Sequence, residues 1–196
     1  MNSLLEKCRE KAIEKVGITV DDAISLCREG RQRPFMLFAY ANEIREHFKD
    51  SRISLCAIIN AKSGICPENC RFCAQSAHYQ TDAPVYALVS PEEMIAKAKE
   101  AQENGAHFFG IVTSGTNIVS DEEWTSIYKA SETMNHMGIH PCGSLGMVTR
   151  DQARRLKEAG MYRYHHNLET ARSYFDEICS THAYEEDITT VRVATQ

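Results

Sequence analysis

The residues best suited to chemistry are three cysteines, Cys66, Cys70 and Cys73, which follow a C-x3-C-x2-C spacing. Gly64 and Pro67 lie beside them and disfavour regular secondary structure, so we expect the three thiols to lie on one loop. Three thiolates that converge from one loop suit a soft metal site, above all an iron–sulfur cluster. With three protein ligands, one iron of a four-iron cluster stays open to another ligand.

A fourth local cysteine is missing, because the next one along the chain is Cys142. A zinc ribbon would need a second cysteine pair, and a bacterial ferredoxin would need a C-x2-C-x2-C-x3-C run. A non-catalytic module that holds zinc is therefore a disfavoured alternative. It stays open at this point, since the spacing does not identify the metal.

The composition is that of an ordinary soluble globular protein, with 43% hydrophobic and 25% charged residues over a length of 196. The net charge of −5 argues against a nucleic acid or an anionic membrane as partner. The first residues carry charges where a signal peptide needs an apolar run, and no apolar run is long enough to span a bilayer. Eight cysteines without such a signal favour the reducing cytoplasm, where clustered cysteines bind metals or act in catalysis.

The elements that must position the cysteines begin with helices. We predict a helical extension over residues 1–50, with caps at Ser3 and Thr19, an end of the second helix at Gly30, and a third helix that begins at Pro34. Four residues of the third helix are spaced for a buried stripe: Phe35, Phe38, Ile44 and Phe48.

From residue 51 on, predicted strands alternate with helices. The strands cover residues 52–59, 107–113, 139–145 and 161–167. The helices between them have predicted caps followed three residues later by Glu or Gln, at Ser90, Ser120 and Thr149. This alternation predicts an α/β fold with a parallel sheet.

Only four strands are visible, whereas a full eight-fold (βα) TIM-type barrel has about 250 residues. We therefore expect residues 51–196 to be about the first half of such a barrel. A half barrel exposes sheet edges and an apolar interior. On its own, the chain is expected to be poorly soluble and inactive.

The carboxyl ends of the strands are the expected place for chemistry in such a sheet. The cysteine loop follows the first strand, Thr113 ends the second, and Asn167 and Glu169 follow the fourth. Asn167 and Glu169 point the same way if the strand persists, and an amide beside a carboxylate suits the hydroxyls of a ribose. The alternative is that both residues start a turn and cap the next helix.

Two further cysteines, Cys56 and Cys142, lie on the first and third predicted strands. The plain interpretation is that each is a small buried hydrophobic residue. Both would line one interior if their faces match, which the alternation pattern alone does not decide.

The cysteine loop, with Phe72 just before its last cysteine, is the signature of the radical S-adenosylmethionine (SAM) enzymes. The wider stretch 60–79 resembles the biotin synthase family. Four further blocks resemble it too, in the same order: residues 110–115, 142–146, 164–170 and 181–185. The bare motif is specific to the superfamily, whereas the set of blocks is specific to biotin synthases. The alternative within enzymes is another radical SAM member of the same subgroup, of the hydrogenase-maturation or methylornithine-forming type.

This resemblance implies that residues 51–196 are a radical SAM core, in which Cys66, Cys70 and Cys73 hold a 4Fe–4S cluster and SAM binds the open iron. The family cleaves SAM to a 5'-deoxyadenosyl radical, which abstracts hydrogen from dethiobiotin, and an auxiliary iron–sulfur cluster donates the sulfur. The implied activity is that of a biotin synthase-like sulfurtransferase. Four residues match positions for SAM or substrate binding: Phe72, Thr113, Asn167 and Glu169.

The resemblance also implies partners, namely an electron donor such as flavodoxin or ferredoxin and a second copy of the full-length chain in a homodimer. Cys142 matches one ligand of the auxiliary cluster, but the position of a second ligand is Gly110 here. The other ligands of the family's 2Fe–2S cluster fall beyond Gln196. We hypothesise that Cys56, on the neighbouring strand, replaces the cysteine lost at Gly110, around a 2Fe–2S cluster or a variant of it.

Overall fold

A computed structural model describes residues 3–196, and the chain divides into two compact units, Met1–Ile53 and Ser54–Gln196. Each unit is described by itself. A functional division between residues 1–50 and 51–196 stays a prediction.

The first unit consists of helices α1 (Leu4–Ile13), α2 (Val20–Gln32) and α3 (Pro34–Lys49). Ser3 and Thr19 are the N-caps, as predicted. The predicted end of α2 at Gly30 is wrong, since the helix continues to Gln32. The proline at position 34 causes the break, because the residue before a proline is disfavoured in helical geometry, and Arg33 has φ −135° and ψ 59°.

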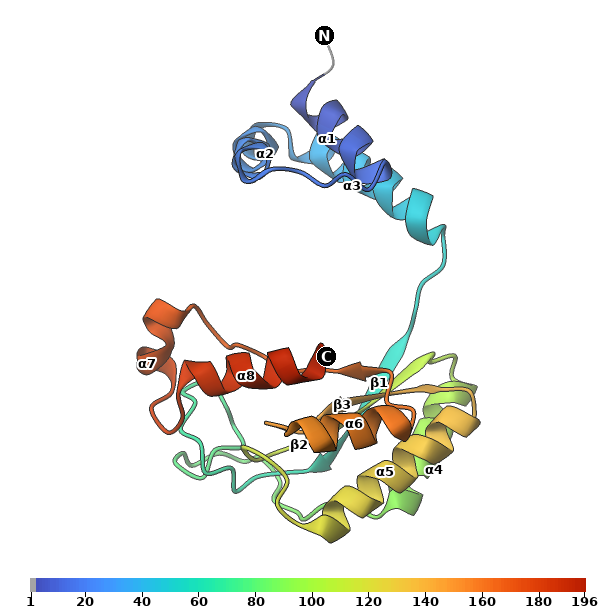
Figure 1. Ribbon diagram of the computed structural model, residues 1–196, viewed down its shortest axis with the longest axis vertical. Coiled ribbons are helices and arrows are strands. Elements are labelled where there is room, and N and C mark those ends of the chain that lie inside the picture. The colour runs from blue at the N-terminus through green and yellow to red at the C-terminus, as the bar shows by residue number, and fades with distance from the viewer. Residues whose placement is uncertain (1–2) are drawn as a thin grey trace. The chain divides into compact units, whose positions relative to one another are not determined.

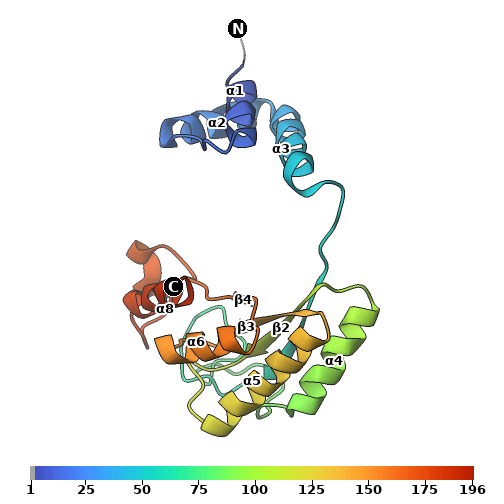
Figure 2. The same cartoon turned by 45° about the vertical axis from the view of Figure 1, so that its right-hand side comes forward.

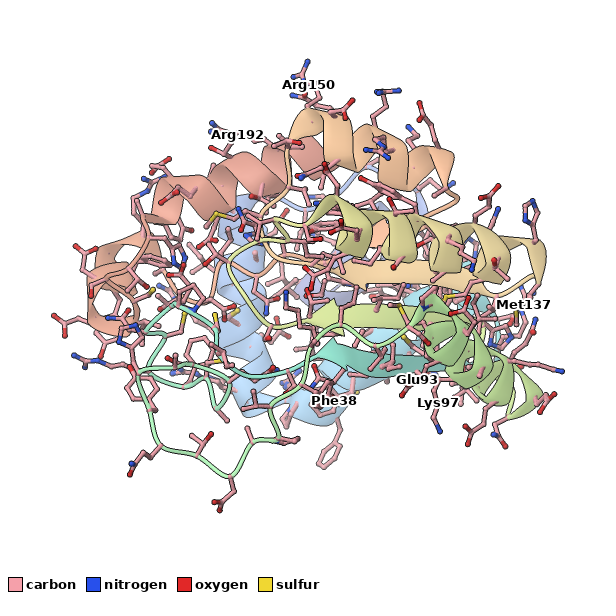
Figure 3. The ribbon with its side chains drawn as sticks, turned by 90° about the horizontal axis from the view of Figure 1, so that it is seen from below. Phe38, Glu93, Lys97, Met137, Arg150 and Arg192 are labelled. Atoms are coloured by element: carbon pink, nitrogen blue, oxygen red, sulfur yellow. The ribbon has the colours of Figure 1, made fainter. Side chains whose placement is uncertain are left out.

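The predicted buried stripe of α3 is also wrong. Phe35 and Phe38 are 83% and 62% exposed, and Phe38 extends away from the helix (Figure 3). Of the four predicted residues only Ile44 is half-buried, and it shares its face of the helix with the half-buried Leu37 and Tyr40. Aromatic residues recur at helical spacing on both faces, so periodicity did not identify the face that packs on α1 and α2.

The second unit is built on a parallel sheet of strands β1 (Cys56–Lys62), β2 (Phe108–Thr113), β3 (His140–Ser144) and β4 (Arg163–Tyr164), in this order. The α/β fold with a partial barrel is therefore as predicted. The boundaries differ at both ends of the sheet. The first strand begins at Cys56 instead of residue 52, and the fourth has only two residues.

Helices α4 (Pro91–Glu103), α5 (Asp121–His136) and α6 (Arg150–Glu158) lie along one face of this sheet (Figures 1 and 2). Their polar side chains, such as Glu93, Lys97 and Arg150, point away from it (Figure 3). The core between the sheet and the helices contains fully buried side chains from both layers: Phe109, Ile111, Trp124, Ile127, Met134 and Leu156.

Local sequence signals explain the ends of these helices. Thr149 and Gln152 form the full reciprocal capping box, whereas Ser120 accepts only the Glu123 N–H. The carboxylate of Glu123 instead binds Nζ of Lys62 at 2.7 Å. Gly160 ends the turn after α6 with φ +85°, where a Cβ atom would lie 2.6 Å from Asn135.

The chain after β4 runs through a 3-10 turn (Arg172–Tyr174) and helices α7 (Phe175–Ile178) and α8 (Tyr184–Ala194). It lies beside the loop that follows β1, as both ribbon views show (Figures 1 and 2). Within the described residues, we find no helix with the length and apolar character needed to cross a membrane.

Candidate functional site

The three predicted ligands lie on the loop between β1 and α4, and this loop has no regular secondary structure. It closes on itself, because the N–H of Cys66 donates to the carbonyl of Gln75 at 3.0 Å and the N–H of Ala77 donates to the carbonyl of Cys66 at 2.8 Å. A tight turn follows, in which the N–H of Cys73 donates to the carbonyl of Cys70 at 3.0 Å. Cys66, Cys70 and Cys73 all line one pocket, which we call the cysteine pocket.

The thiols of this pocket are suited to binding a metal. Burial raises the pKa of Cys66, against the pull of hydrogen bonds from the N–H groups of Glu68 and Gly115. Burial, together with a hydrogen bond to Cys179, raises the pKa of Cys70 to about 12. Such thiols stay protonated and unreactive unless a metal ion replaces the proton. The three thiols of Cys66, Cys70 and Cys73 around one pocket fit a 4Fe–4S cluster with one open iron.

Thr113, Asn167 and Glu169 line the same pocket, so the structure brings three of the four predicted binding residues to the cysteines. The hydroxyl of Thr113 is buried and has no hydrogen-bond partner within the described chain. Since buried hydroxyls are normally satisfied, this group is available to a ligand. Phe72 is different, because its ring is 59% exposed and is not among the residues that line the pocket.

Asn167 and Glu169 would point the same way only on a strand that continues to them, and this condition is not met. β4 ends at Tyr164, and Glu169 has the left-handed φ of +59°. The capping alternative does not hold either, since the N-cap of the following turn is Ala171 and it has no side-chain hydrogen bond. Both residues reach the pocket through the irregular chain after β4.

Cys56 and Cys142 lie on the same face of the sheet. Cys142 on β3 pairs with Gly110 on β2, which pairs with Ile58 on β1. Cys56 lies two residues before Ile58 and therefore points to the same face as Ile58 and Cys142. The two thiols are close enough for Cys56 to raise the pKa of Cys142, although burial is the larger cause. Arg163, next to Cys142 on β4, opposes this rise. Whether these cysteines bind a metal stays a prediction.

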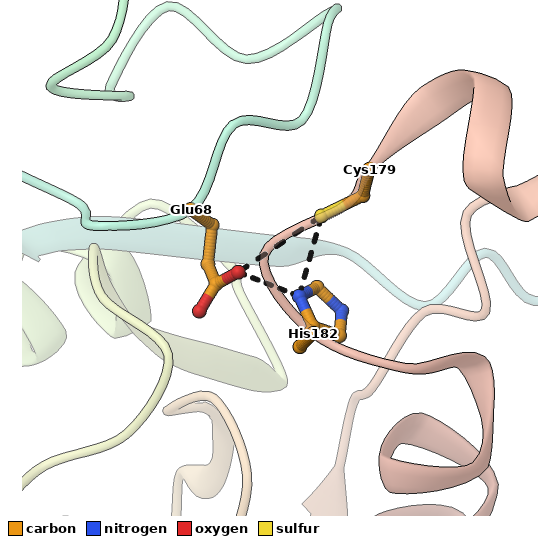
Figure 4. Close-up of side chains that lie close together, drawn as sticks. All are labelled: Glu68, Cys179 and His182. Atoms are coloured by element: carbon orange, nitrogen blue, oxygen red, sulfur yellow. Dashed lines mark hydrogen bonds and ion pairs between the residues drawn. The ribbon is translucent and has the colours of Figure 1, made fainter.

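Sequence reasoning missed a buried polar cluster against the cysteine pocket. The carboxylate of Glu68 accepts hydrogen bonds from the hydroxyls of Thr116 and Thr181 and lies 2.6 Å from Nδ1 of His182. The thiol of Cys179 lies 3.3 Å from the same nitrogen (Figure 4). The only sequence signal was the block 181–185, which resembles the family and contains His182 but does not indicate its partner.

The geometry identifies this cluster as an ion pair rather than a metal site. Glu68, Cys179 and His182 offer three ligand atoms within 4.8 Å of one another. Two ligands at about 2.0–2.1 Å from a tetrahedral zinc ion would lie roughly 3.3 Å apart. The observed 2.6 Å between Oε2 of Glu68 and Nδ1 of His182 is instead the length of a charge-assisted hydrogen bond. These bonds also lower the pKa of Glu68 against the opposing effect of burial.

The chain is similar to curated biotin synthases. It is 50% identical over 195 residues to those of Geotalea daltonii and Geotalea uraniireducens, covering 99% of this chain and 59% of each relative. The biotin synthase of Geobacter sulfurreducens is 54% identical over 159 residues, covering 81% of this chain and 48% of the relative. The chain thus spans little more than half the length of the relatives that it matches.

Two solved structures share the fold at 20% identity: methylornithine synthase (PylB), with a TM-score of 0.76, and HydG, a maturase of the [FeFe]-hydrogenase, with a TM-score of 0.77. They cover 99% and 98% of this chain, which covers 56% and 44% of theirs. Residues 61–196, which include the cysteine pocket, match the protein family described as the radical SAM superfamily. The chain therefore belongs to the radical SAM superfamily.

Proposed function

We propose that this chain supplies the radical-generating part of a biotin synthase, which converts dethiobiotin to biotin. The observation that carries the proposal is the cysteine pocket, where the buried Cys66 and the half-buried Cys70 and Cys73 meet the Thr113 hydroxyl, which has no partner within the described chain, beside Asn167 and Glu169. The similarity to biotin synthases at 50% identity supports this substrate over those of the other superfamily members.

When bound, a 4Fe–4S cluster with SAM supplies the one-electron cleavage of SAM to methionine and a 5'-deoxyadenosyl radical, and an auxiliary iron–sulfur cluster supplies the sulfur. The protein's part is to bind and orient these groups. Cys66, Cys70 and Cys73 would hold the first cluster, and the N–H groups of Glu68 and Gly115 would stabilise the Cys66 thiolate.

The polar groups around the cysteines would orient SAM. The Thr113 hydroxyl would bond to its methionine part, and the Asn167 amide with the Glu169 carboxylate would bind the ribose hydroxyls. Such positioning fixes the direction in which the radical leaves SAM, which determines the hydrogen atom that it reaches.

Cys142 and Cys56 would contribute to the auxiliary cluster from the inner face of the sheet. Their shared face and their electrostatic interaction support this assignment. Gly110 provides no thiol, and a Cβ there would lie 3.0 Å from Cγ2 of Ile58.

The remaining partners belong to the same proposal. A small reductant such as flavodoxin or ferredoxin would deliver the electron, and a second full-length chain would form a homodimer. The eight free cysteines suit the reducing cytoplasm.

The direct test uses the intact gene product that contains this sequence, reconstituted anaerobically with iron and sulfide. After dithionite, SAM and dethiobiotin are added, we expect 5'-deoxyadenosine and biotin by mass spectrometry. Formation of 5'-deoxyadenosine without biotin, under conditions in which a known biotin synthase makes both, would reject dethiobiotin as the substrate and favour another radical SAM reaction. A colourless protein that retains zinc would reject the iron–sulfur site.

The role of Cys56 has its own test in the same protein. We expect Cys56→Ala to lower the auxiliary iron and sulfide content while the 4Fe–4S cluster on the loop is kept. An unchanged auxiliary content would remove Cys56 from the ligand set.

A further inference from the structure

Four buried side chains form a continuous chain in which carboxylates and imidazoles alternate: Glu68, His182, Asp187 and His166. Nδ1 of His182 lies 2.6 Å from Glu68, and its Nε2 lies 3.3 Å from Oδ2 of Asp187. The other oxygen of Asp187 lies 2.9 Å from Nε2 of His166. The side chains are 5% to 12% exposed. The chain joins the cysteine loop, the segment after β4 and helix α8.

The position of His182 between two carboxylates favours its positively charged form. Ionised carboxylates only accept hydrogen bonds, so an imidazole with a carboxylate at each nitrogen must donate from both. Burial alone would lower the pKa of His182, but the hydrogen bond with Glu68 and the nearby charges of Cys179 and Asp187 raise it. These contacts therefore favour a cationic His182 between two acidic groups from different segments.

His182, with Glu68 and Asp187 on its two sides, lies where the cysteine loop is hydrogen-bonded to the segment before α8. Glu68 is between Cys66 and Cys70 in the sequence. The N–H of Arg71 donates to the carbonyl of Ile178 at 3.0 Å, and the side chain of Asn69 binds the N–H of Ser180 at 2.9 Å. The backbone that carries Cys70 is thus held by the segment that ends in His182.

We propose that His182 is a positioning residue that fixes the geometry of the cysteine loop by bridging Glu68 and Asp187 as a cation. Without the charge, Glu68 and Asp187 would be two buried carboxylates without a shared cation, and their repulsion would push the loop away from α8. The loop would then hold its cluster less firmly. The inference rests on the proposed 4Fe–4S site, but it is independent of the proposed substrate.

The test compares His182→Gln with His182→Arg in the intact gene product. Glutamine keeps a donor but no charge, whereas a guanidinium is always charged and has enough donors for both carboxylates. Residues that hold metal ligands in place without binding the metal typically change metal affinity or activity by a factor of 10 to 100 when they are mutated. We therefore expect the glutamine variant to lose its cluster to a chelator roughly tenfold faster than the wild type. We expect the cluster of the arginine variant to survive the chelator for most of its wild-type lifetime.

Hydrogen exchange in the metal-free protein provides a second readout. We expect the amide of Arg71 to exchange faster in His182→Gln than in the wild type, and to be protected again in His182→Arg. His136→Gln is the matched control, because His136 is an exposed residue at the end of α5 and the same substitution there should change neither quantity. Circular dichroism confirms that each variant is folded.

Three results would overturn the proposal. The first is a glutamine variant with wild-type cluster lifetime and wild-type exchange at Arg71. The second is a folded arginine variant that behaves like the glutamine variant, because the charge would then not be the relevant property. The third is weaker SAM binding alone, which would make His182 a ligand of SAM. Because exchange at Arg71 is measured without metal, it tests the bridge even if the protein makes no biotin.

Discussion

Ion pairs occur in both units of this protein, but in very different surroundings. In the first unit, Lys11 binds Asp22 at 2.6 Å and Arg9 binds Glu43 at 3.0 Å, with side chains that are 21% to 50% exposed. In the second unit, His182 lies between Glu68 and Asp187, and none of the three side chains is more than 11% exposed.

Burial, more than the distance between the charged atoms, sets how much an ion pair contributes to stability. Exposed pairs contribute about 0–1 kcal/mol at most, because water and salt screen them. Loss of one partner from a buried pair costs about 3–5 kcal/mol, because a charge is left without compensation. We therefore expect the first unit to lose its ion pairs with little effect, and the second unit to be sensitive to the loss of the buried pairs beside the cysteine loop.

The largest effect is expected from the cysteines themselves. Cys70→Ala should abolish the loop cluster and with it the cleavage of SAM, measured as iron content and 5'-deoxyadenosine after anaerobic reconstitution of the intact gene product. Cys27→Ala is the matched control in the first unit, because Cys27 is exposed on α2. Loss of the loop cluster in the control variant would contradict the assignment.

The second-largest effect is expected from a buried apolar side chain of the second unit, compared with an exposed one of the first. Ile127 is fully buried in α5, so Ile127→Ala should destabilise the second unit by about 2–5 kcal/mol, whereas Phe38→Ala at a site 62% exposed should stay within about 0.5 kcal/mol. Urea unfolding checks this, with the 196-residue chain kept at low concentration so that it stays in solution. Trp124 is the only tryptophan, so its fluorescence follows the second unit, and circular dichroism at 222 nm follows the helices of the first unit in Phe38→Ala. A cost below about 1 kcal/mol for Ile127→Ala would contradict the described core.

The buried bridge predicts a pH dependence with a definite sign. The folded pKa of His182 is raised above its ordinary value of 6.5, so its stabilising contribution is fully present below pH 6.5 and is lost as the pH rises through the folded value. The groups that face it are Glu68, Asp187 and Cys179, together with the ring of Phe175.

Cys179 acts in the opposite direction. Burial alone would raise the pKa of Cys179, but hydrogen bonds that include those of Thr181 lower it, so its contribution grows with pH. We therefore expect the loss of stability above pH 6.5 to be clearest in a metal-free Cys179→Ala variant. Unfolding of this variant is measured by Trp124 fluorescence. The loss should disappear when His182→Arg is added, and its persistence there would assign it to another group.

The smallest effect is expected from the exposed pair of the first unit. The hydrogen bond from Lys11 is the main cause that lowers the pKa of Asp22 to about 2, from an ordinary value of 3.8. Its contribution is present above pH 3.8 and is lost as the pH falls through about 2. Asp22→Asn should therefore lower the helicity of α1 and α2 slightly at neutral pH and low salt, with no difference at high salt. A salt-independent loss would show that the Thr19 cap, which Asp22 also serves, is the larger contribution.

Much of the fold was predictable because the signals are local. The caps at Ser3, Thr19 and Thr149 involve residues three positions apart, and glycine after α6 ends the helix through its own backbone freedom. The loop of Cys66, Cys70 and Cys73 was equally local, since Gly64 and Pro67 exclude regular structure there.

The errors arose where distant residues decide. The packed face of α3 depends on α1 and α2, and β4 ends at Tyr164 although the sequence after it would permit a longer strand. Glu68 was overlooked because its partner His182 is 114 positions away in sequence, and no local pattern marks a carboxylate that will be buried against it.

By itself, the sequence determined the loop that carries three closely spaced cysteines, the alternation that produces a parallel sheet, and the resemblance to radical SAM enzymes. These properties depend on residue type and short spacing. Only the tertiary structure decided that Cys56 and Cys142 share a face, that Thr113 has an unsatisfied hydroxyl in the cysteine pocket, and that His182 bridges two acidic groups. Strand register and burial bring such residues together, and both are set by the packing of the whole unit.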